Sequence, residues 1–294
     1  MQKKGTCLCS ICRGKAFFMR KFIKIKDTII NIYKCSSCGC EFLYPGPLEQ
    51  ELLKEYKGYY LKRCSGTRKV KQNYFKYLLK KTKINFSNKS VLEIGGGEGD
   101  CAGALLTLFP NVKATVVESN PESIQYYKDL KCVYINDSFK NWADKHKNES
   151  FDIILLFDLL EHIDEPVEIL KKIINNNLKE HGYIIATFPN VDSISRKVLR
   201  RCWPQYKLEH LYYFSKISVL KMSEVLGLKT IVLKPLMKKL PIDYYLSVGS
   251  NFGPETVKKI TKIVKAVTPG FISRIEMPMF FGEWLFIVKK NNNF

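Results

Sequence analysis

The sequence predicts an α/β protein with a Rossmann-like, doubly wound and mostly parallel sheet, preceded by a small cysteine-rich module. Three observations lead to this prediction. From residue 90 onward, apolar strand-like runs alternate with helical patterns, as in a parallel sheet that helices cover on both faces. The first strand ends in a glycine-rich turn, and residues 1–46 hold six of the ten cysteines.

The strands of the predicted sheet are short, apolar and rich in β-branched residues. They are expected at 90–94, 113–118, 132–136, 151–157 and 182–188. Helical patterns or compact turns follow the first four of them, at 100–109, 120–130, 138–145 and 165–178. Pro121 and Pro166 stand early in their helices, where proline removes no hydrogen bond. In such sheets, ligands bind beyond the carboxyl ends of the strands.

The remaining segments suggest three parts of the chain. A Pro/Gly cluster at 44–47, "YPGP", marks a module boundary. Residues 191–215 form an irregular connection, followed by further elements at 216–227 (helix), 229–235 (strand), 254–267 (helix) and 283–290 (strand). We therefore expect a cysteine module at 1–46, a helical connector at 47–89 and a main domain with a C-terminal extension at 90–294.

The turn "VLEIGGGEGD" (91–100) after the first strand is the main functional signal. Gly95, Gly97 and Gly99 fall at every second position, where the lack of a Cβ lets a ligand approach the backbone. Dinucleotide-binding turns have the spacing G-x-G-x-x-G instead, and the acids Glu98 and Asp100 would repel a pyrophosphate. A cationic ligand without phosphate fits better, and S-adenosylmethionine (SAM) is such a ligand.

Polar side chains follow the next strands of the same sheet. Glu118 ends the second strand, where a carboxylate can bind both ribose hydroxyls. Asp137 follows the third strand, with Phe139 beside it, and the two could hold the edge and the face of an adenine. Asp158 and the segment "LLEHI" stand at the end of the fourth strand. These groups meet at one edge of the sheet, which strengthens the prediction of a SAM site.

The cysteines near the N-terminus have the spacing of a zinc site. Two C-x-x-C pairs are separated by 22 residues, and a glycine closely follows each pair. The predicted ligands are Cys9, Cys12, Cys35 and Cys38. Four thiolates complete a tetrahedral shell, so we expect a structural Zn²⁺ in a zinc ribbon. Cys7 and Cys40 lie beside the pairs, and either could replace a neighbouring ligand.

The ordered motifs resemble those of class I SAM-dependent methyltransferases, in particular the subgroup with an N-terminal cysteine zinc module. The matching segments are 91–100, 116–129, 151–173, 178–190 and 209–227, and the resemblance covers roughly residues 5–235. It implies that Glu93, Gly95, Gly97 and Gly99 border the methionine part of the cofactor, that Glu118 binds the ribose, and that Asp137 and Phe139 meet the adenine. It also implies that the zinc module lies over the active-site face.

Methyl transfer from a sulfonium needs mainly alignment of the reacting atoms, plus a base if the acceptor must lose a proton. Two of the four histidines stand near the ligand edge: His162 in "DLLEH" and His210, next to Glu209, in "KLEHLYYF". Either His210 or His162 could be the base, or no protein base is needed. Related zinc-module enzymes that methylate carbon carry Tyr-x-Glu-His at this place, but here Lys207 replaces the tyrosine.

The net charge of +20 is unevenly distributed. Residues 1–90 carry +16 (21 basic, 5 acidic), residues 91–190 carry −7 (9 and 16), and residues 191–294 carry +11 (18 and 7). Lysine makes up 40 of the 48 cations, whereas recognition of phosphates and bases favours arginine. A lysine-rich solvated surface explains most of this charge, and the basic flanks also suit an anionic acceptor.

The leading hypothesis is methylation, preferably on oxygen, of a small molecule such as a sugar or glycan precursor or a secondary metabolite. RNA methylation with the zinc module as RNA grip is an alternative, although the fourth strand is followed by "DLLEH" and lacks the N/D-P-P-Y/F tetrapeptide of amino-methylating nucleic-acid enzymes. A catalytically silent scaffold is a third possibility. We expect no secretory signal and no membrane span, and hence a cytoplasmic protein.

Overall fold

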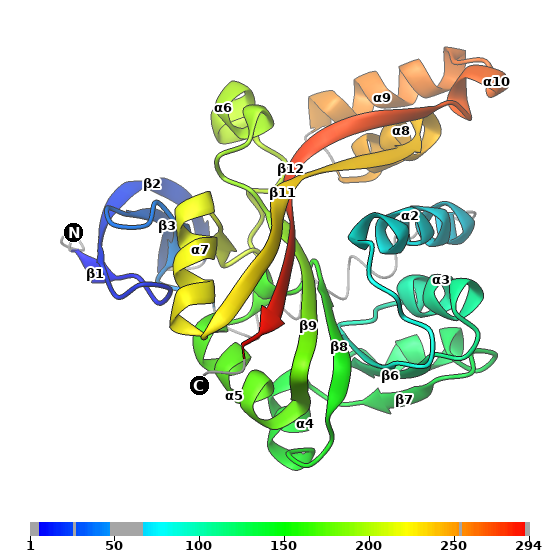
Figure 1. The fold of residues 1–294 in the computed structure, drawn as a ribbon. Helices are drawn as coiled ribbons and strands as arrows, with labels where there is room; N and C mark the ends of the chain where they lie inside the picture. The colour runs from blue at the N-terminus through cyan, green and yellow to red at the C-terminus, as the bar shows by residue number, and fades with distance from the viewer. Residues whose placement is uncertain (1–5, 26–27, 48–66, 253–254, 292–294) are drawn as a thin grey trace.

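A computed structural model of the chain describes residues 6–25, 28–47, 67–252 and 255–291. Its strands form two sheets, one of seven strands in the order β11-β12-β9-β8-β5-β6-β7 and one of five in the order β1-β2-β3-β4-β10. Figure 1 shows the small sheet beside the large one, with helices packed along both. Residues 48–66 of the predicted helical connector lie outside the described residues.

The large sheet confirms the predicted doubly wound, mostly parallel architecture. Its strands are β5 (Ser90–Ile94), β6 (Lys113–Glu118), β7 (Val133–Asn136), β8 (Phe151–Phe157), β9 (Leu178–Pro189), β11 (Leu228–Pro241) and β12 (Glu276–Lys290). The strands from β5 to β9 pair in parallel, whereas β12 is antiparallel to β9 and to β11. The carboxyl ends of β5, β6, β7 and β8 therefore meet at one edge.

Helices connect these strands largely where the sequence predicts them. They are α2 (Thr67–Thr82), α3 (Asp100–Leu108), α4 (Phe139–Lys145), α5 (Pro166–Asn177) and α7 (Lys216–Val225), with short 3-10 turns η1 (Pro121–Tyr126) and η2 (Leu160–His162). Side-chain caps fix several starts: Ser138 accepts a hydrogen bond from the backbone N–H of Asn141, and Ser215 accepts one from that of Ser218. The helical pattern predicted at 120–130 corresponds to a shorter element, the 3-10 turn η1.

The small sheet contains the cysteine module and one strand from far along the chain. Its members are β1 (Cys7–Leu8), β2 (Lys15–Ile25), β3 (Thr28–Cys35), β4 (Glu41–Tyr44) and β10 (Tyr212–Tyr213). β10 pairs antiparallel with β4, with Tyr212 opposite Phe42. The segment predicted as an irregular connection thus holds β10, preceded by α6 (Ile194–Leu199) and η3 (Arg200–Cys202). These residues tie the module to the main domain.

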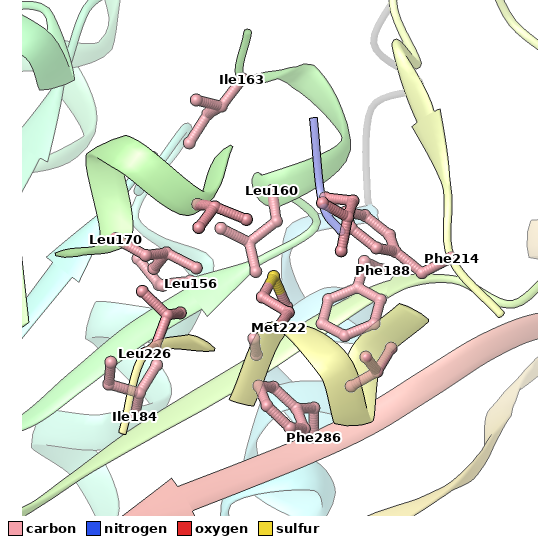
Figure 2. Packing of buried hydrophobic residues seen from close by; sticks show 14 of the residues in the cluster. Leu156, Leu160, Ile163, Leu170, Ile184, Phe188, Phe214, Met222, Leu226 and Phe286 are labelled. Carbon is pink, nitrogen blue, oxygen red and sulfur yellow. The ribbon is translucent and has the colours of Figure 1, made fainter. Parts of the chain in front are cut away.

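One hydrophobic core joins the two sheets. Its cluster of buried residues contains Cys9, Ile11 and Phe42 of the module as well as Leu156 of β8 and Met222 of α7. Figure 2 shows the part of this cluster where Met222 of α7 lies among Leu160, Phe188 and Phe286, while Leu226, just after α7, lies beside Ile184. Burial of this shared surface means that the module does not move independently of the sheet.

A charged network reinforces the same junction. Glu41 of β4 is fully buried, and it accepts hydrogen bonds from Arg196 of α6 and from the Tyr206 hydroxyl at 2.6 Å. A buried carboxylate of this kind needs such partners, since an unpaired one would lose its solvation. The network therefore fixes the connection between β9 and β10 against the module.

The C-terminal extension forms a projecting arm that the sequence did not predict. Strands were expected at 229–235 and 283–290, but β11 continues to Pro241 and β12 begins at Glu276. The prolonged hairpin carries α8 (Ile242–Phe252), α9 (Glu255–Val267) and α10 (Gly270–Ser273) away from the sheet (Figure 1). Among the described residues, no helix combines the length and the apolar character needed to cross a membrane.

Candidate active site

The glycine turn opens a cradle at the carboxyl end of β5. Gly95, Gly97 and Gly99 have φ values of 76°, 54° and 71°, in the left-handed region that L side chains rarely adopt. A Cβ on Gly97 would have no atom within 4 Å, so the space above this residue is open. Gly99 is the N-cap of α3, and the turn therefore presents backbone groups to that space.

Glu118 at the end of β6 holds this turn in place. Its side chain is buried, and Oε2 accepts a hydrogen bond from the Gly97 N–H at 2.8 Å. Oε1 accepts a second one from the Asn120 N–H at 2.7 Å. The predicted cofactor carboxylate thus lies directly beside the predicted glycine turn, and its role in ribose binding stays a prediction.

Glu93 lies beneath the turn in a position that suits a cationic ligand. Burial raises its pKa to about 8, although a hydrogen bond from Cys101 opposes this shift. Its Oε2 is buried and has no hydrogen-bond partner. A nearby positive charge favours the ionised carboxylate. The open space above Gly97 and this unpartnered oxygen therefore fit a sulfonium cofactor such as SAM.

Asp137 and Phe139 follow β7, at the far end of the predicted cofactor cleft. The Lys145 ammonium donates a hydrogen bond of 2.8 Å to Asp137 Oδ2, and this contact lowers the pKa of Asp137. Phe139 is half-buried and packs against the main core. Asp137 already has a side-chain partner on α4, so its predicted contact with adenine stays untested.

A charged cluster at the carboxyl end of β8 joins Asp158, whose side chain is 47% exposed, to the half-buried Lys238 of β11 and the buried Glu283 of β12. Asp158 has φ 50°, accepts a hydrogen bond from the Thr187 hydroxyl at 2.7 Å and lies 3.5 Å from Lys238 Nζ. Lys238 Nζ also lies 2.7 Å from Glu283 Oε1. Burial disfavours ionisation of Asp158, but Lys238 and Thr187 outweigh it and lower the pKa. Burial would lower the pKa of Lys238, but the carboxylates of Asp158 and Glu283 outweigh it and raise this pKa.

Next to this cluster lie the two histidines that the sequence singled out. The rings of His162 and His210 meet edge to face, with centroids 4.8 Å apart. His162 Nδ1 is 2.8 Å from the Glu209 carbonyl oxygen, to which it donates. His210 is 4% exposed and its Nδ1 has no hydrogen-bond partner. Leu159, three residues before His162, lies against Gly95, so the turn that carries His162 lies at the same sheet edge as the glycine turn.

Burial controls the protonation of this pair. It lowers the pKa of His162 to about 4, with Lys207 contributing further. Burial, His162 and Lys207 together hold the pKa of His210 well below its ordinary value. Both imidazoles are therefore neutral at physiological pH, and the unpartnered Nδ1 of His210 is a ready proton acceptor.

The carboxylate that faces the histidines is Glu161 rather than Glu209. Ligand atoms of Glu161, His162 and His210 all lie within 4.8 Å of one another, whereas the Glu209 carboxylate lies 3.9 Å from Lys207 Nζ. Burial raises the pKa of Glu161 well above its usual range, and its Oε2 has no partner. The three side chains could hold a metal ion, or Glu161 could share a proton with a histidine.

The four predicted zinc ligands converge in the small sheet. Cys9, Cys12, Cys35 and Cys38 place their sulfurs within 4.8 Å of one another. Cys9 and Cys38 are 3.7 Å apart, and Cys12 and Cys35 are 3.5 Å apart. Cys40, one of the alternative ligands, is buried and its thiol contacts the Glu41 carbonyl. A set of four convergent thiols matches the chemistry of structural Zn²⁺.

Sequence reasoning found the strand-end residues but missed their partners from the C-terminal arm. Lys238 and Glu283 belong to β11 and β12, and nothing in their local pattern separates them from other surface charges. Glu161 was visible only as part of "LLEHI". A carboxylate within an otherwise apolar turn directly after a buried strand is the signal that could have identified it.

Comparisons with known proteins agree with this arrangement. The family described as "Methyltransferase domain" matches residues 67–232. None of the curated proteins compared with the chain matches it. A SAM-dependent methyltransferase from Archaeoglobus fulgidus is 17% identical, with a TM-score of 0.50 over 76% of this chain and 97% of that one. The YcgJ protein from Bacillus subtilis is 16% identical, with a TM-score of 0.52 over 75% and 100%.

A third solved structure has a comparable sequence identity and TM-score to this chain. It is the methyltransferase of Haloferax volcanii in complex with the Trm112 methyltransferase activator, 14% identical, with a TM-score of 0.54 over 78% of this chain and 95% of that one. These likenesses are in the fold, and the family match covers more than half of the chain. The chain therefore belongs to the methyltransferase-domain family, and its fold is that of class I, SAM-dependent methyltransferases.

Proposed function

We propose that this enzyme methylates a small-molecule acceptor, preferably on oxygen, with His210 as the general base. The observation that carries the proposal is the buried, unpartnered Nδ1 of His210, next to His162 after the carboxyl end of β8. A hydroxyl acceptor must lose its proton as the methyl group arrives, and a neutral imidazole can take it. A sugar or glycan precursor or a secondary metabolite would supply such a hydroxyl.

The roles of the other residues follow from their positions. Gly95, Gly97 and Gly99 would border the methionine part of SAM, with Glu93 and Asp158 supplying negative charge near the sulfonium. Glu118 would bind the ribose, and Asp137 with Phe139 would hold the adenine. His162 would position His210 through their ring contact of 4.8 Å, and Glu209 would orient His162 through its carbonyl. SAM itself supplies the electrophilic methyl group.

The basic flanks of the chain, +16 in residues 1–90 and +11 in residues 191–294, support an acceptor that carries a phosphate or another acid. We divide the chain into a cysteine module (1–46), a connector (47–89) and a main domain (90–294). The module contributes β4, which pairs with β10, and β10 begins two residues after His210. The module would therefore close the acceptor side of the site, and we propose that it binds zinc for this structural purpose.

Transfer of labelled methyl groups tests this function. The purified chain is incubated with radiolabelled SAM and, separately, with nucleotide-linked sugars, with phenolic and hydroxylated metabolites, and with total RNA. We expect label in a small acidic acceptor and none in RNA. Label that enters only RNA, with binding that weakens as salt is raised, would favour the nucleic-acid alternative instead.

The pH dependence of turnover is a second prediction. The pKa of His210 lies well below 6.5 because the ring is buried, so the base stays deprotonated across the neutral range. The rate constant kcat should rise with pH through this low value and then stay level from slightly acidic pH upward. An acid limb centred at or above pH 6.5 would contradict this assignment, and SAM binding measured over the same range controls for cofactor loss.

Substitution of Glu118 is expected to weaken cofactor binding. Glu118→Ala removes a charged acceptor from the ribose side and leaves the Gly97 N–H without its 2.8 Å partner. We expect a loss of at least about 1 kcal/mol, roughly fivefold in Kd, in calorimetry with SAM. Glu122→Ala removes an exposed carboxylate nearby and should leave the affinity unchanged. Equal affinity of both variants would refute the ribose assignment.

A further inference from the structure

The helix α9 on the projecting arm exposes an apolar face to solvent. Ile260, Ile263 and Val267 are 60%, 66% and 73% exposed, and Val264 is 40% exposed. At 3.6 residues per turn, these four positions lie on one side of the helix. We call Ile260, Ile263, Val264 and Val267 the arm face.

The opposite, polar side of α9 is the one that packs. Lys265 Nζ donates to Ser247 Oγ of α8 at 2.7 Å and lies 3.1 Å from Asp243 Oδ1. Lys258 and Thr261, on the same side, are less exposed than the arm face. An amphipathic helix normally buries its apolar side, so α9 has the reverse orientation. Within the described part of the arm, the arm face is therefore left largely uncovered.

Further exposed apolar groups and cations accompany the arm face. Phe271 of α10 is 74% exposed and Ile275 is 51% exposed. Lys259 and Lys262 are exposed on α9, and the helical spacing puts Lys259 at the border of the arm face and Lys262 further round. A strongly amphipathic helix with Lys on its polar side is typical of segments that lie in a membrane interface.

We propose that the arm face docks on an anionic lipid bilayer. The apolar side chains would enter the boundary between headgroups and acyl chains, while Lys259 and Lys262 contact the anionic headgroups. The formal net charge of +20 favours this partner over a second copy of the chain, because two identical cationic chains repel each other. Figure 1 shows α9 along the projecting part of the β11–β12 hairpin, on the far side of the large sheet from the small sheet.

Docking would also place the active site near the membrane surface. Lys238 of the charged cluster lies on β11, three residues before the strand ends at Pro241, and α8 begins at the next residue, Ile242. An acceptor in or near the bilayer would then be within reach of the enzyme. Membrane binding itself does not depend on the identity of the acceptor or on SAM.

Sedimentation with lipid vesicles tests the docking. The full chain is mixed with vesicles of phosphatidylcholine alone or in equal parts with phosphatidylglycerol. We expect binding to the anionic vesicles, lowered at least about tenfold by Ile263→Glu and about thirtyfold by Lys259→Gln combined with Lys262→Gln. Ile217→Glu on α7 replaces an isoleucine that is 55% exposed and should bind like the original chain. Unchanged melting temperatures show that the variants fold.

Three outcomes would overturn the proposal. The first is no binding to anionic vesicles. The second is binding that Ile263→Glu leaves intact, because the overall charge would then suffice. The third is self-association in sedimentation velocity that Ile263→Glu abolishes while vesicles stay unbound, which would assign the arm face to a second copy. SAM binding, measured on the same samples, reports separately on the proposed function.

Discussion

Replacing His210 by asparagine is expected to lower kcat by a factor of about 10²–10⁴, the usual contribution of a positioned general base. Asparagine is polar and close in size, but it cannot take up a proton at neutral pH. The ring of His210 is buried and makes its contacts through His162 and the backbone of Gln205. Assays of S-adenosylhomocysteine formation, quenched at fixed times at saturating SAM and acceptor, would give the decrease in kcat directly.

The matched control is His181→Asn. His181 is exposed and has φ 62°, a conformation that asparagine tolerates, so neither folding nor turnover should change. His162→Asn should lower kcat less than His210→Asn, because His162 acts through its neighbour. The base assignment fails if His210→Asn keeps full turnover, and it passes to His162 if that variant has the larger loss.

If Glu161, His162 and His210 held a metal ion, His210→Asn would lower kcat as well, because the substitution would remove a metal ligand. The two explanations differ in metal content. Elemental analysis of the purified chain after chelation should find only the metal of the cysteine site, and turnover should survive chelation that spares this site. A second bound metal that disappears in both His210→Asn and Glu161→Gln would identify a metal centre instead.

Loss of the zinc site is expected to cause the largest change in stability. Apparent binding free energies of structural zinc are about 10–16 kcal/mol at neutral pH, as large as the whole net stability of a typical domain, about 5–15 kcal/mol. Cys35→Ser should therefore yield protein without stoichiometric zinc and with a strongly lowered melting temperature. Zinc content and thermal unfolding followed by circular dichroism would both report the effect.

The destabilisation should extend beyond the module. Cys9 and Ile11 share one buried cluster with Leu156 and Met222, and β10 pairs with β4. We expect the main sheet to unfold at a lower temperature together with the module, in one transition. Cys202→Ser changes an exposed cysteine and should have no effect, while Cys40→Ser should keep its zinc. Full zinc content in Cys35→Ser would show that another cysteine replaces it.

Local physical rules in the sequence determined the parallel sheet and the glycine turn. The runs at 90–94, 113–118 and 151–157 agree with β5, β6 and β8 residue by residue, because buried parallel strands must be apolar throughout and must be followed by helices or turns. The two C-x-x-C pairs predicted the four thiols that converge, since the ligand spacing within a zinc ribbon is itself local.

Only the tertiary structure decided which distant groups meet. The proximity of Glu161 to His210, the contact of Lys238 with Asp158 and the addition of β10 to β4 all join segments that are far apart in the chain. The outward orientation of the apolar side of α9 is of the same kind: the pattern of the helix was readable, but which side packs depends on Asp243 and Ser247 of α8. Such contacts depend on how strands and helices stack, and sequence periodicity carries information only about the face of one element at a time.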